Sequence, residues 1–282
     1  MLRGRSPKSL AGYSSGSTFD VVLDLGSRFS GGARRSEFMK YLVISDVHAN
    51  LEALEATLAK AGPHDGVLVL GDLVGYGADP NAVIDRIRQL PRSTIIRGNH
   101  DKVGAGIENV EAFNHLAKQA ITWTATELTP GNRAWLAALP AGPVCIDDFV
   151  EICHGSPVDE DVYIFDELDA RQALFRSQRP LCLFGHTHVP AVYKQDTDFH
   201  PVGPPRGEMF RLLLDDAAKY LVNCGAVGQP RDGDSRAAFG MLDTATGNLT
   251  VIRTPYDVTT AQAKIIAAGL PEVLAQRLAI GR

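Results

Sequence analysis

Short apolar runs alternate with segments of helical periodicity in the first half of the chain. Runs rich in β-branched residues predict strands of a buried parallel sheet at residues 41–45, 66–70 and 93–96. After the first run, Asn50 is a suitable helix N-cap, and leucines follow it at helical spacing. Asp79 and Pro80 open a second predicted helix in the same way. This order predicts a βαβαβ unit that begins near Met39.

The second half of the chain is rich in strands and predicts a largely antiparallel arrangement. Apolar runs flank residues 147–148 as in a hairpin, and further runs alternate with turn residues. A helix is expected near 167–176, and two more over 258–282, divided by Gly269 and Pro271. A βαβαβ half followed by a strand-rich half predicts two packed sheets with helices outside them.

Residues 1–38 are rich in Ser, Gly and Arg and have no apolar period. No apolar segment with a small-residue cleavage site occurs there, so a secretory signal is not supported. Asp20, Asp24 and Glu37 argue against an organelle transit peptide, which is poor in acidic residues. We predict a disordered N-terminal extension, followed by a single domain over residues 39–282.

A chain that begins at Met39 should therefore fold and function like the full chain, because the removed residues contribute nothing to the predicted core. We expect its melting temperature and its activity to match those of the full chain. A large loss of either would contradict this prediction.

Composition narrows the class of protein. The chain has 282 residues, 45% hydrophobic and 22% charged, as in ordinary globular proteins. A formal net charge of -5 does not suggest a stable nucleic-acid partner, and no apolar run approaches the roughly 18 residues of a membrane span. Four cysteines without a C-x-x-C pair predict buried, inert thiols in a reducing cytoplasm: Cys145, Cys153, Cys182 and Cys224. We expect a cytoplasmic protein.

Carboxylate, carboxamide or imidazole side chains follow five of the predicted strands. These endings are Asp46 to His48, Asp72, Asn99 to Asp101, His154, and His186 to His188. They contain five of the eight histidines, and only His64, His115 and His200 lie elsewhere. A single such histidine is best explained as a turn residue whose hydrogen bonds are satisfied locally. Five strand ends of the same kind instead indicate a site, at the edge where α/β sheets bind ligands.

The predicted site has the donors of a metal centre. D-x-H and H-x-H sequences place alternate side chains on one face of an extended segment. The candidate ligands are Asp46, His48, Asp72, Asn99, His154, His186 and His188. They are too many for one zinc ion and too rich in imidazole for calcium or magnesium, whereas mixed oxygen and nitrogen donors suit Mn²⁺, Fe or Zn²⁺. Two ions about 3.5–4 Å apart would activate water against a phosphate ester.

The motifs D-x-H, G-D, G-N-H-D, H and G-H-x-H, in this order, resemble those of the calcineurin-like metallophosphoesterase superfamily. The resemblance runs from Met39 to about Arg236 and implies a four-layer αββα sandwich of two mixed sheets. It also implies that one metal is bound by Asp46, His48, Asp72 and His188. The other metal would be bound by Asp72, Asn99, His154 and His186, with Asp72 as the bridge.

The same resemblance implies the catalytic roles. His100 would stay off the metals and stabilise or protonate the leaving oxygen, with Asp72 as the other catalytic residue. Asp101 would orient the groups beside it. The implied cofactors are two divalent ions, with Mn²⁺ as the first choice and Fe, Zn, Ni or Co as alternatives.

Differences within the superfamily narrow the substrate. Protein serine/threonine phosphatases carry Asp and Arg where Gly75 and Tyr76 stand here. "SDVHANLEAL", "GDLVGYGADPN", "HGSP" and "NCGAVGQPRDGD" instead resemble the small bacterial phosphodiesterase-like branch, from which Cys224 and Ala226 depart. Arg231 is a candidate phosphate contact, although an exposed Arg in a polar loop explains it equally well.

Three functions remain open at this point. The first is a phosphodiesterase acting on small or nucleotide substrates. The second is a dinucleoside polyphosphate hydrolase or a phosphomonoesterase. The third is a non-catalytic metal-binding scaffold, against which the complete ligand set argues. The sequence also leaves a homodimer open, and the acidic residues 159–161 are expected to form a solvated face without a basic partner.

Overall fold

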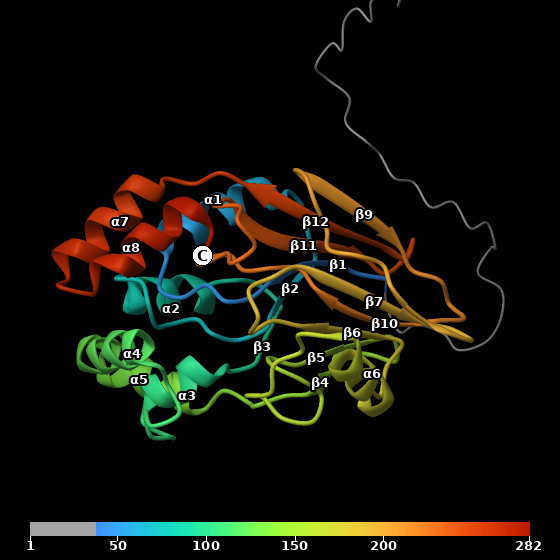
Figure 1. Cartoon of the computed structure of the whole chain (residues 1–282), viewed down its shortest axis with the longest axis horizontal. Coiled ribbons are helices and arrows are strands. Elements are labelled where there is room, and N and C mark those ends of the chain that lie inside the picture. Colours follow the sequence, from blue (N-terminus) through green and yellow to red (C-terminus); the bar gives the residue numbers. More distant parts are fainter. Residues whose placement is uncertain (1–37) are drawn as a thin grey trace, which may run out of the picture.

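The computed structural model describes residues 38–282, which form two six-stranded sheets packed face to face (Figure 1). The predicted N-terminal extension lies outside the described residues except for Phe38. Within the described range, no helix combines the length and the apolar character needed to cross a membrane.

The first sheet has the strand order β3-β2-β1-β11-β12-β9. Its strands are β1 (Lys40–Ile44), β2 (Gly66–Val69), β3 (Ser93–Ile95), β9 (Met209–Leu213), β11 (Ala237–Asp243) and β12 (Asn248–Thr254). β1, β2 and β3 are parallel, whereas β11 pairs antiparallel with β1. The predicted βαβαβ unit is therefore one half of a mixed sheet, and strands from the end of the chain complete it.

The second sheet has the order β4-β5-β6-β10-β7-β8. Its strands are β4 (Val144–Cys145), β5 (Val150–Ile152), β6 (Leu181–Phe184), β7 (Ala191–Gln195), β8 (Phe199–Pro201) and β10 (Lys219–Asn223). The predicted hairpin is present as the antiparallel pair β4–β5. The prediction of a largely antiparallel half is confirmed, with an exception at the centre of this sheet, where β5, β6 and β10 run parallel. A helical crossover between β5 and β6 makes the parallel pairing possible.

Eight helices accompany the sheets in the described part of the chain. They are α1 (Leu51–Ala61), α2 (Pro80–Arg88), α3 (Asn99–Ala105), α4 (His115–Glu127), α5 (Pro130–Ala137), α6 (Glu167–Arg176), α7 (Val258–Ala267) and α8 (Glu272–Ile280). The side chain of Asn50 caps α1 by accepting a hydrogen bond from the N–H of Ala53. The predicted division between the last two helices is confirmed, with Gly269 at a positive φ of 70°.

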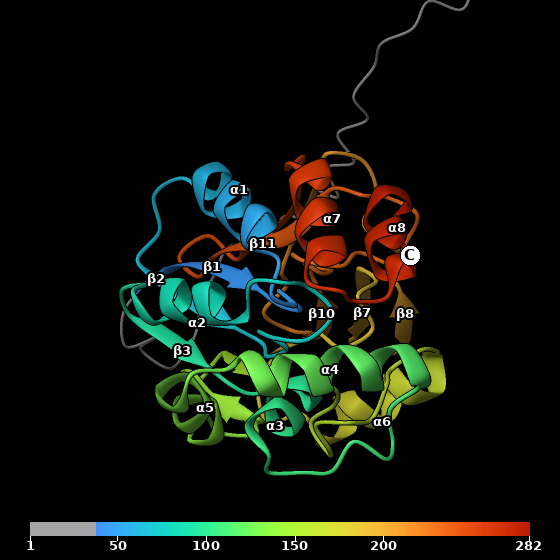
Figure 2. The same ribbon diagram turned by 90° about the vertical axis from the view of Figure 1, so that its left-hand side faces the viewer.

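The alternation of side chains along the strands creates the layers. In β1, Leu42 and Ile44 pack in the core that includes α1 and α2, whereas Tyr41 and Val43 face the second sheet. On the far side, Phe184 of β6 packs with the residues of α6. Figure 2 shows α1 and α7 on one side of the sheets and α6 on the other. The predicted four-layer αββα sandwich is confirmed.

One part of the cysteine prediction is wrong. All four cysteines are free thiols, but only Cys153, Cys182 and Cys224 are buried. Cys145 is exposed because it belongs to β4, a two-residue strand at the edge of the second sheet.

Candidate metal centre

Polar side chains from the carboxyl ends of strands in both sheets meet at one edge of the sandwich. Asp46 follows β1 and Asp72 follows β2 in the first sheet. His154 follows β5 and His186 follows β6 in the second sheet. All the predicted ligands are buried except Asn99, which is half-buried. The fold thus brings the five strand endings of the sequence to a single place.

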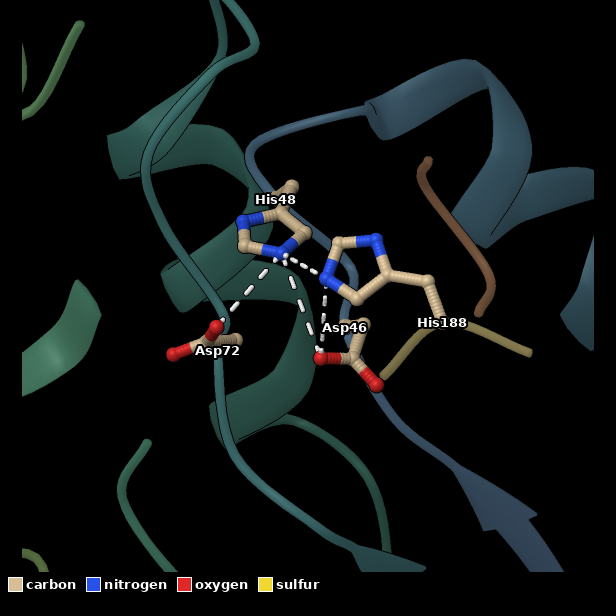
Figure 3. A group of neighbouring side chains, drawn as sticks. All are labelled: Asp46, His48, Asp72 and His188. Carbon is tan, nitrogen blue, oxygen red and sulfur yellow. Dashed lines mark hydrogen bonds and ion pairs between the residues drawn. The ribbon is translucent and has the colours of Figure 1, made fainter. Parts of the chain in front are cut away.

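One group of donors comprises Asp46, His48, Asp72 and His188, whose ligand atoms lie within 4.8 Å of one another (Figure 3). The Nε2 atoms of His48 and His188 are 3.0 Å apart. Oδ2 of Asp72 lies 3.5 Å from Nε2 of His48, and Oδ1 of Asp46 lies 3.3 Å from Nε2 of His188. These four groups are the ones expected to bind one metal.

The second group shares Asp72 with the first. Ligand atoms of Asp72, His154 and His186 lie within 4.8 Å of one another. Nε2 of His154 is 3.4 Å from Oδ2 of Asp72 and 3.3 Å from Oδ1 of Asn99, so the amide joins this group. The other oxygen of Asp72 accepts a 2.9 Å hydrogen bond from the N–H of His100, which fixes the carboxylate.

Hydrogen bonds to the backbone determine which imidazole nitrogens are available. Nδ1 of His48 donates to the carbonyl of Val74 over 3.0 Å, and Nδ1 of His188 donates to that of Gln229 over 2.6 Å. The Nε2 atoms that face each other therefore both carry lone pairs, which repel at 3.0 Å. A divalent cation accepts both lone pairs and removes the repulsion. The donor set fits two divalent metal ions that share Asp72.

Burial keeps most of the imidazoles neutral, as metal ligands must be. It lowers the pKa of His48 and of His188 well below the ordinary value, and that of His186 to about 3. His154 differs: burial opposes its charge, but the charge and hydrogen bond of Asp72, together with Asp46 and the carbonyl of Leu70, raise its pKa to about 10. Before a metal binds, a proton on His154 balances the negative charge of the carboxylates, and a metal ion at Nε2 would replace that proton.

The backbone at the centre is strained. Five of the seven predicted ligands have positive φ angles, between 48° and 65°: Asp46, His48, Asp72, His186 and His188. Residues other than glycine rarely adopt this region, at a cost of about 1–3 kcal/mol each. Such strain is found where a fold must aim side chains at one point, and here it turns the ligands inward after β1, β2 and β6.

The side chain of His100 lies among aromatic rings. Its side chain is buried, and Nδ1 has no hydrogen-bond partner among the described residues. The ring centroids of Tyr76, Phe113 and His48 lie 4.5, 4.6 and 4.8 Å from that of His100. A Cβ atom on Gly75 would lie 2.3 Å from Nδ1. The Asp that protein phosphatases carry at this place therefore has no room beside the ring.

Asp101 connects the two loops that carry the shared ligand and His100. Its carboxylate accepts hydrogen bonds from the N–H groups of Leu73, Val74 and Gly98 at 2.9, 3.2 and 2.9 Å. Burial and the charge of Asp72 raise the pKa of Asp101 to about 7. A Cβ atom on Gly98 would meet Oδ1 of Asp72 at 2.2 Å, so this close approach requires glycine. Asp101 thus orients the backbone of the site.

Arg231 lies at the centre and not free in its loop. Its guanidinium carbon is 5.5 Å from the ring centroid of Tyr76, and Nη2 donates to Oε1 of Gln229 over 3.0 Å. Burial and, after it, the charge of Arg231 lower the pKa of His188. The position is compatible with the predicted contact to a phosphate.

The prediction that residues 159–161 form an unpaired solvated face is wrong. Arg97 donates two hydrogen bonds to Glu160, of 3.1 and 3.0 Å. Nζ of Lys102, in α3, lies 2.5 Å from Oδ2 of Asp161. Both cations come from segments far earlier in the chain, so the sequence pattern could not reveal the pairs. They attach the acidic loop to the metal centre.

Sequence reasoning also missed two groups beside His186. Nε2 of His186 donates to the carbonyl oxygen of Asp161 over 3.1 Å, which leaves Nδ1 for a metal. The ring of Tyr163 stacks on His186 with centroids 3.7 Å apart. Any residue type can supply a backbone carbonyl, and Tyr163 does not directly follow a predicted strand. The sequence motifs therefore indicated neither group.

The family model of the calcineurin-like phosphoesterase superfamily domain matches residues 39–247. The chain belongs to this superfamily. The uncharacterized protein MJ0912 of Methanocaldococcus jannaschii is 34% identical over 247 residues, which cover 85% of this chain and 97% of that protein. These matches confirm the resemblance found in the motifs.

Solved structures agree with this assignment. A metallophosphoesterase from Sphaerobacter thermophilus is 38% identical, with a TM-score of 0.77, and the match covers 87% of this chain and all of that one (100%). The hypothetical protein PH1004 from Pyrococcus horikoshii OT3 has the same fold at 20% identity, with a TM-score of 0.70 and coverage of 86% and 98%. As a calcineurin-like phosphoesterase with this donor set, the protein is a metal-dependent phosphoester hydrolase.

Divalent metal should stabilise this phosphoesterase, because metal binding offsets the repulsion and strain of the site. At a metal concentration of 100 Kd we expect about 2.7 kcal/mol of stabilisation and a rise of about 5–10 °C in melting temperature. Thermal unfolding with Mn²⁺ and with a chelator measures the shift. Asp72→Asn should lose most of the shift, and an unchanged melting temperature in the parent protein would contradict the metal centre.

Gly75→Ala should displace the ring of His100 and lower kcat about a hundredfold, since small misplacements of a catalytic group have effects of this order. Metal content should stay unchanged, because Gly75 contributes no ligand. Gly203→Ala is the matched control: its φ is 87° against 86° for Gly75, but no atom lies within 4 Å of its added Cβ. Equal losses in both variants would show that backbone strain, and not the contact with His100, is responsible.

Proposed function

We propose that the protein is a phosphodiesterase that hydrolyses small or nucleotide phosphodiesters by in-line attack of water. The observation that carries the proposal is that two groups of oxygen and nitrogen donors share Asp72, while His100 lies beside them outside both groups. Two divalent ions, when bound, supply Lewis-acid activation of water and of the phosphate oxygens.

The residues of this chain have separate roles in the proposed reaction. Asp72 connects the two donor groups, and the remaining six ligands hold them from both sheets. His100 faces the leaving oxygen, which it stabilises or protonates as that oxygen gains charge. Arg231 binds a phosphate oxygen through its planar guanidinium.

The charges around the site favour a diester over a monoester. Arg97 and Lys102 are neutralised by Glu160 and Asp161. Arg231 remains to meet the substrate, because its polar partner, Gln229, is uncharged. A diester carries one negative charge and a monoester dianion carries two, so a single guanidinium beside the metals suits the diester.

A substrate panel with the metal-loaded enzyme tests the proposal. It compares bis(p-nitrophenyl) phosphate, p-nitrophenyl phosphate and diadenosine tetraphosphate, and we expect the highest kcat/KM for the diester. Asp72→Asn, prepared in parallel, measures the background from contaminating phosphatases. Preference for the monoester or the tetraphosphate would replace the proposed function by one of those activities. Absence of turnover with all three would favour a scaffold.

We infer further properties from the sequence and the donor set. Mn²⁺ is the proposed metal, with Fe, Zn, Ni and Co as alternatives, because mixed carboxylate, amide and imidazole ligands suit these ions. The net charge of -5 and the free cysteines support a cytoplasmic protein without a stable nucleic-acid partner. Metal analysis of the protein as purified tests the first inference, and its mass in solution tests whether it forms a homodimer.

A further inference from the structure

A stack of aromatic rings leads from the metal centre into solvent. Tyr163 covers the ring of His186, with centroids 3.7 Å apart and an interplanar angle of 23°. Phe165 stacks on Tyr163 at 4.8 Å and 9°. Exposure increases outward, from 3% for His186 through 39% for Tyr163 to 70% for Phe165. One end of the stack is a predicted metal ligand, and the other is an open aromatic face.

The segment that carries the stack is firmly attached to the site. Asp161 accepts the hydrogen bond from His186 and pairs with Lys102, two residues after His100. Glu160, one residue earlier, holds Arg97 by two hydrogen bonds. These contacts fix the backbone immediately before Tyr163. The two rings therefore have a defined position relative to the catalytic groups.

Core packing does not account for the exposed end of the stack. Phe165 belongs to none of the described hydrophobic clusters, and its 70% exposure leaves apolar surface in water. Stacked, nearly parallel rings present a flat surface, which suits another planar ring better than an aliphatic chain. Purines and pyrimidines both stack on aromatic side chains, and such stacking tolerates any base.

We propose that Tyr163 and Phe165 form a stacking subsite for the base of a nucleotide substrate. The inference rests on the proposed phosphodiesterase function and names its substrate class as nucleotide esters. Two stacking steps, of 4.8 and 3.7 Å between ring centroids, separate Phe165 from His186, so the sugar of the nucleotide would have to extend along the stack for its base to reach Phe165 with its phosphate at the metals.

Binding of AMP and of ribose 5-phosphate to the metal-loaded enzyme, measured by calorimetry, tests the subsite. The two ligands share sugar and phosphate and differ in the base. Phe165→Ala should weaken AMP binding about tenfold, the order found when a stacking side chain is removed, and leave ribose 5-phosphate unchanged. Phe165→Trp should restore AMP binding, whereas Phe165→Leu, apolar but without a flat ring, should not.

The control is Phe175→Ala, which removes a ring that is 82% exposed on α6 and lies outside the stack. It should leave both affinities unchanged. The affinity for phenyl phosphate is measured as well. If Phe165→Ala weakened the binding of phenyl phosphate tenfold and left AMP binding unchanged, the rings would be assigned to aryl esters and the nucleotide inference would be overturned. Equal losses for AMP and ribose 5-phosphate would overturn it too.

Phe165→Ala could also change the oligomeric state of the protein in solution. If it did so without loss of AMP affinity, Tyr163 and Phe165 would form a subunit contact and the inference would be overturned. Failure of the proposed function is recognised separately, because the parent enzyme would then prefer the monoester or the tetraphosphate, or would turn over none of the three substrates. Loss of the subsite alone leaves diester hydrolysis intact and removes only the preference for esters that carry a base.

Discussion

Asp72→Asn is expected to remove nearly all phosphoesterase activity and to lower the metal content of both groups of donors. Asp72 is shared by the two groups, so loss of its charge weakens both ions at once. Replacing groups that merely support a ligand reduces metal affinity about 10–100-fold, and a shared ligand should exceed that range. Activity assays and metal analysis of the purified variant measure both effects.

The substitution is conservative in shape, which isolates the effect of charge. An amide oxygen at this position can still accept the hydrogen bond from the N–H of His100. Asp85→Asn, at an exposed position of α2, is the matched control and should change neither metal content nor activity. Full metal content in Asp72→Asn would show that the carboxylate is not the shared ligand.

His100→Ala should lower kcat about 10²–10⁴-fold, the usual contribution of a general acid, and leave the metal content unchanged. The ring lies against Tyr76 and Phe113 and belongs to neither group of donors. Steady-state kinetics with a diester, together with metal analysis, distinguish loss of chemistry from loss of metal.

His200→Ala provides the comparison for this variant, since His200 is exposed and lies outside the site. We expect it to behave like the parent enzyme. If His100→Ala lost metal in proportion to activity, His100 would act through the metal centre and not on the leaving oxygen.

The sequence revealed the centre because its ligands follow a rule of backbone geometry. Parallel strands end at one edge of a sheet, so carboxylates, amides and imidazoles after several strands must gather there. Asp46, Asp72 and His186 could be placed by this rule although nothing local connects them. The order of motifs added the assignment to a family, and the family indicated the four layers.

Features that depend on contacts between distant segments could not be predicted from the sequence by this rule. The pairing of Lys102 with Asp161 joins α3 to a loop 59 residues later. The carbonyl that orients His186 could belong to any residue type. The exposure of Cys145 depends on which strand forms the edge of the second sheet, and apolar periodicity does not determine strand order.

The origin of the ligands in two different sheets has a consequence for the whole molecule. Asp46 and Asp72 move with one sheet, and His154 and His186 move with the other. A slip of one layer over the other would leave every strand paired and yet disperse the donors. The apolar residues between the layers, such as Val43 and Ile152, therefore set the spacing of the reactive groups without ever meeting a substrate.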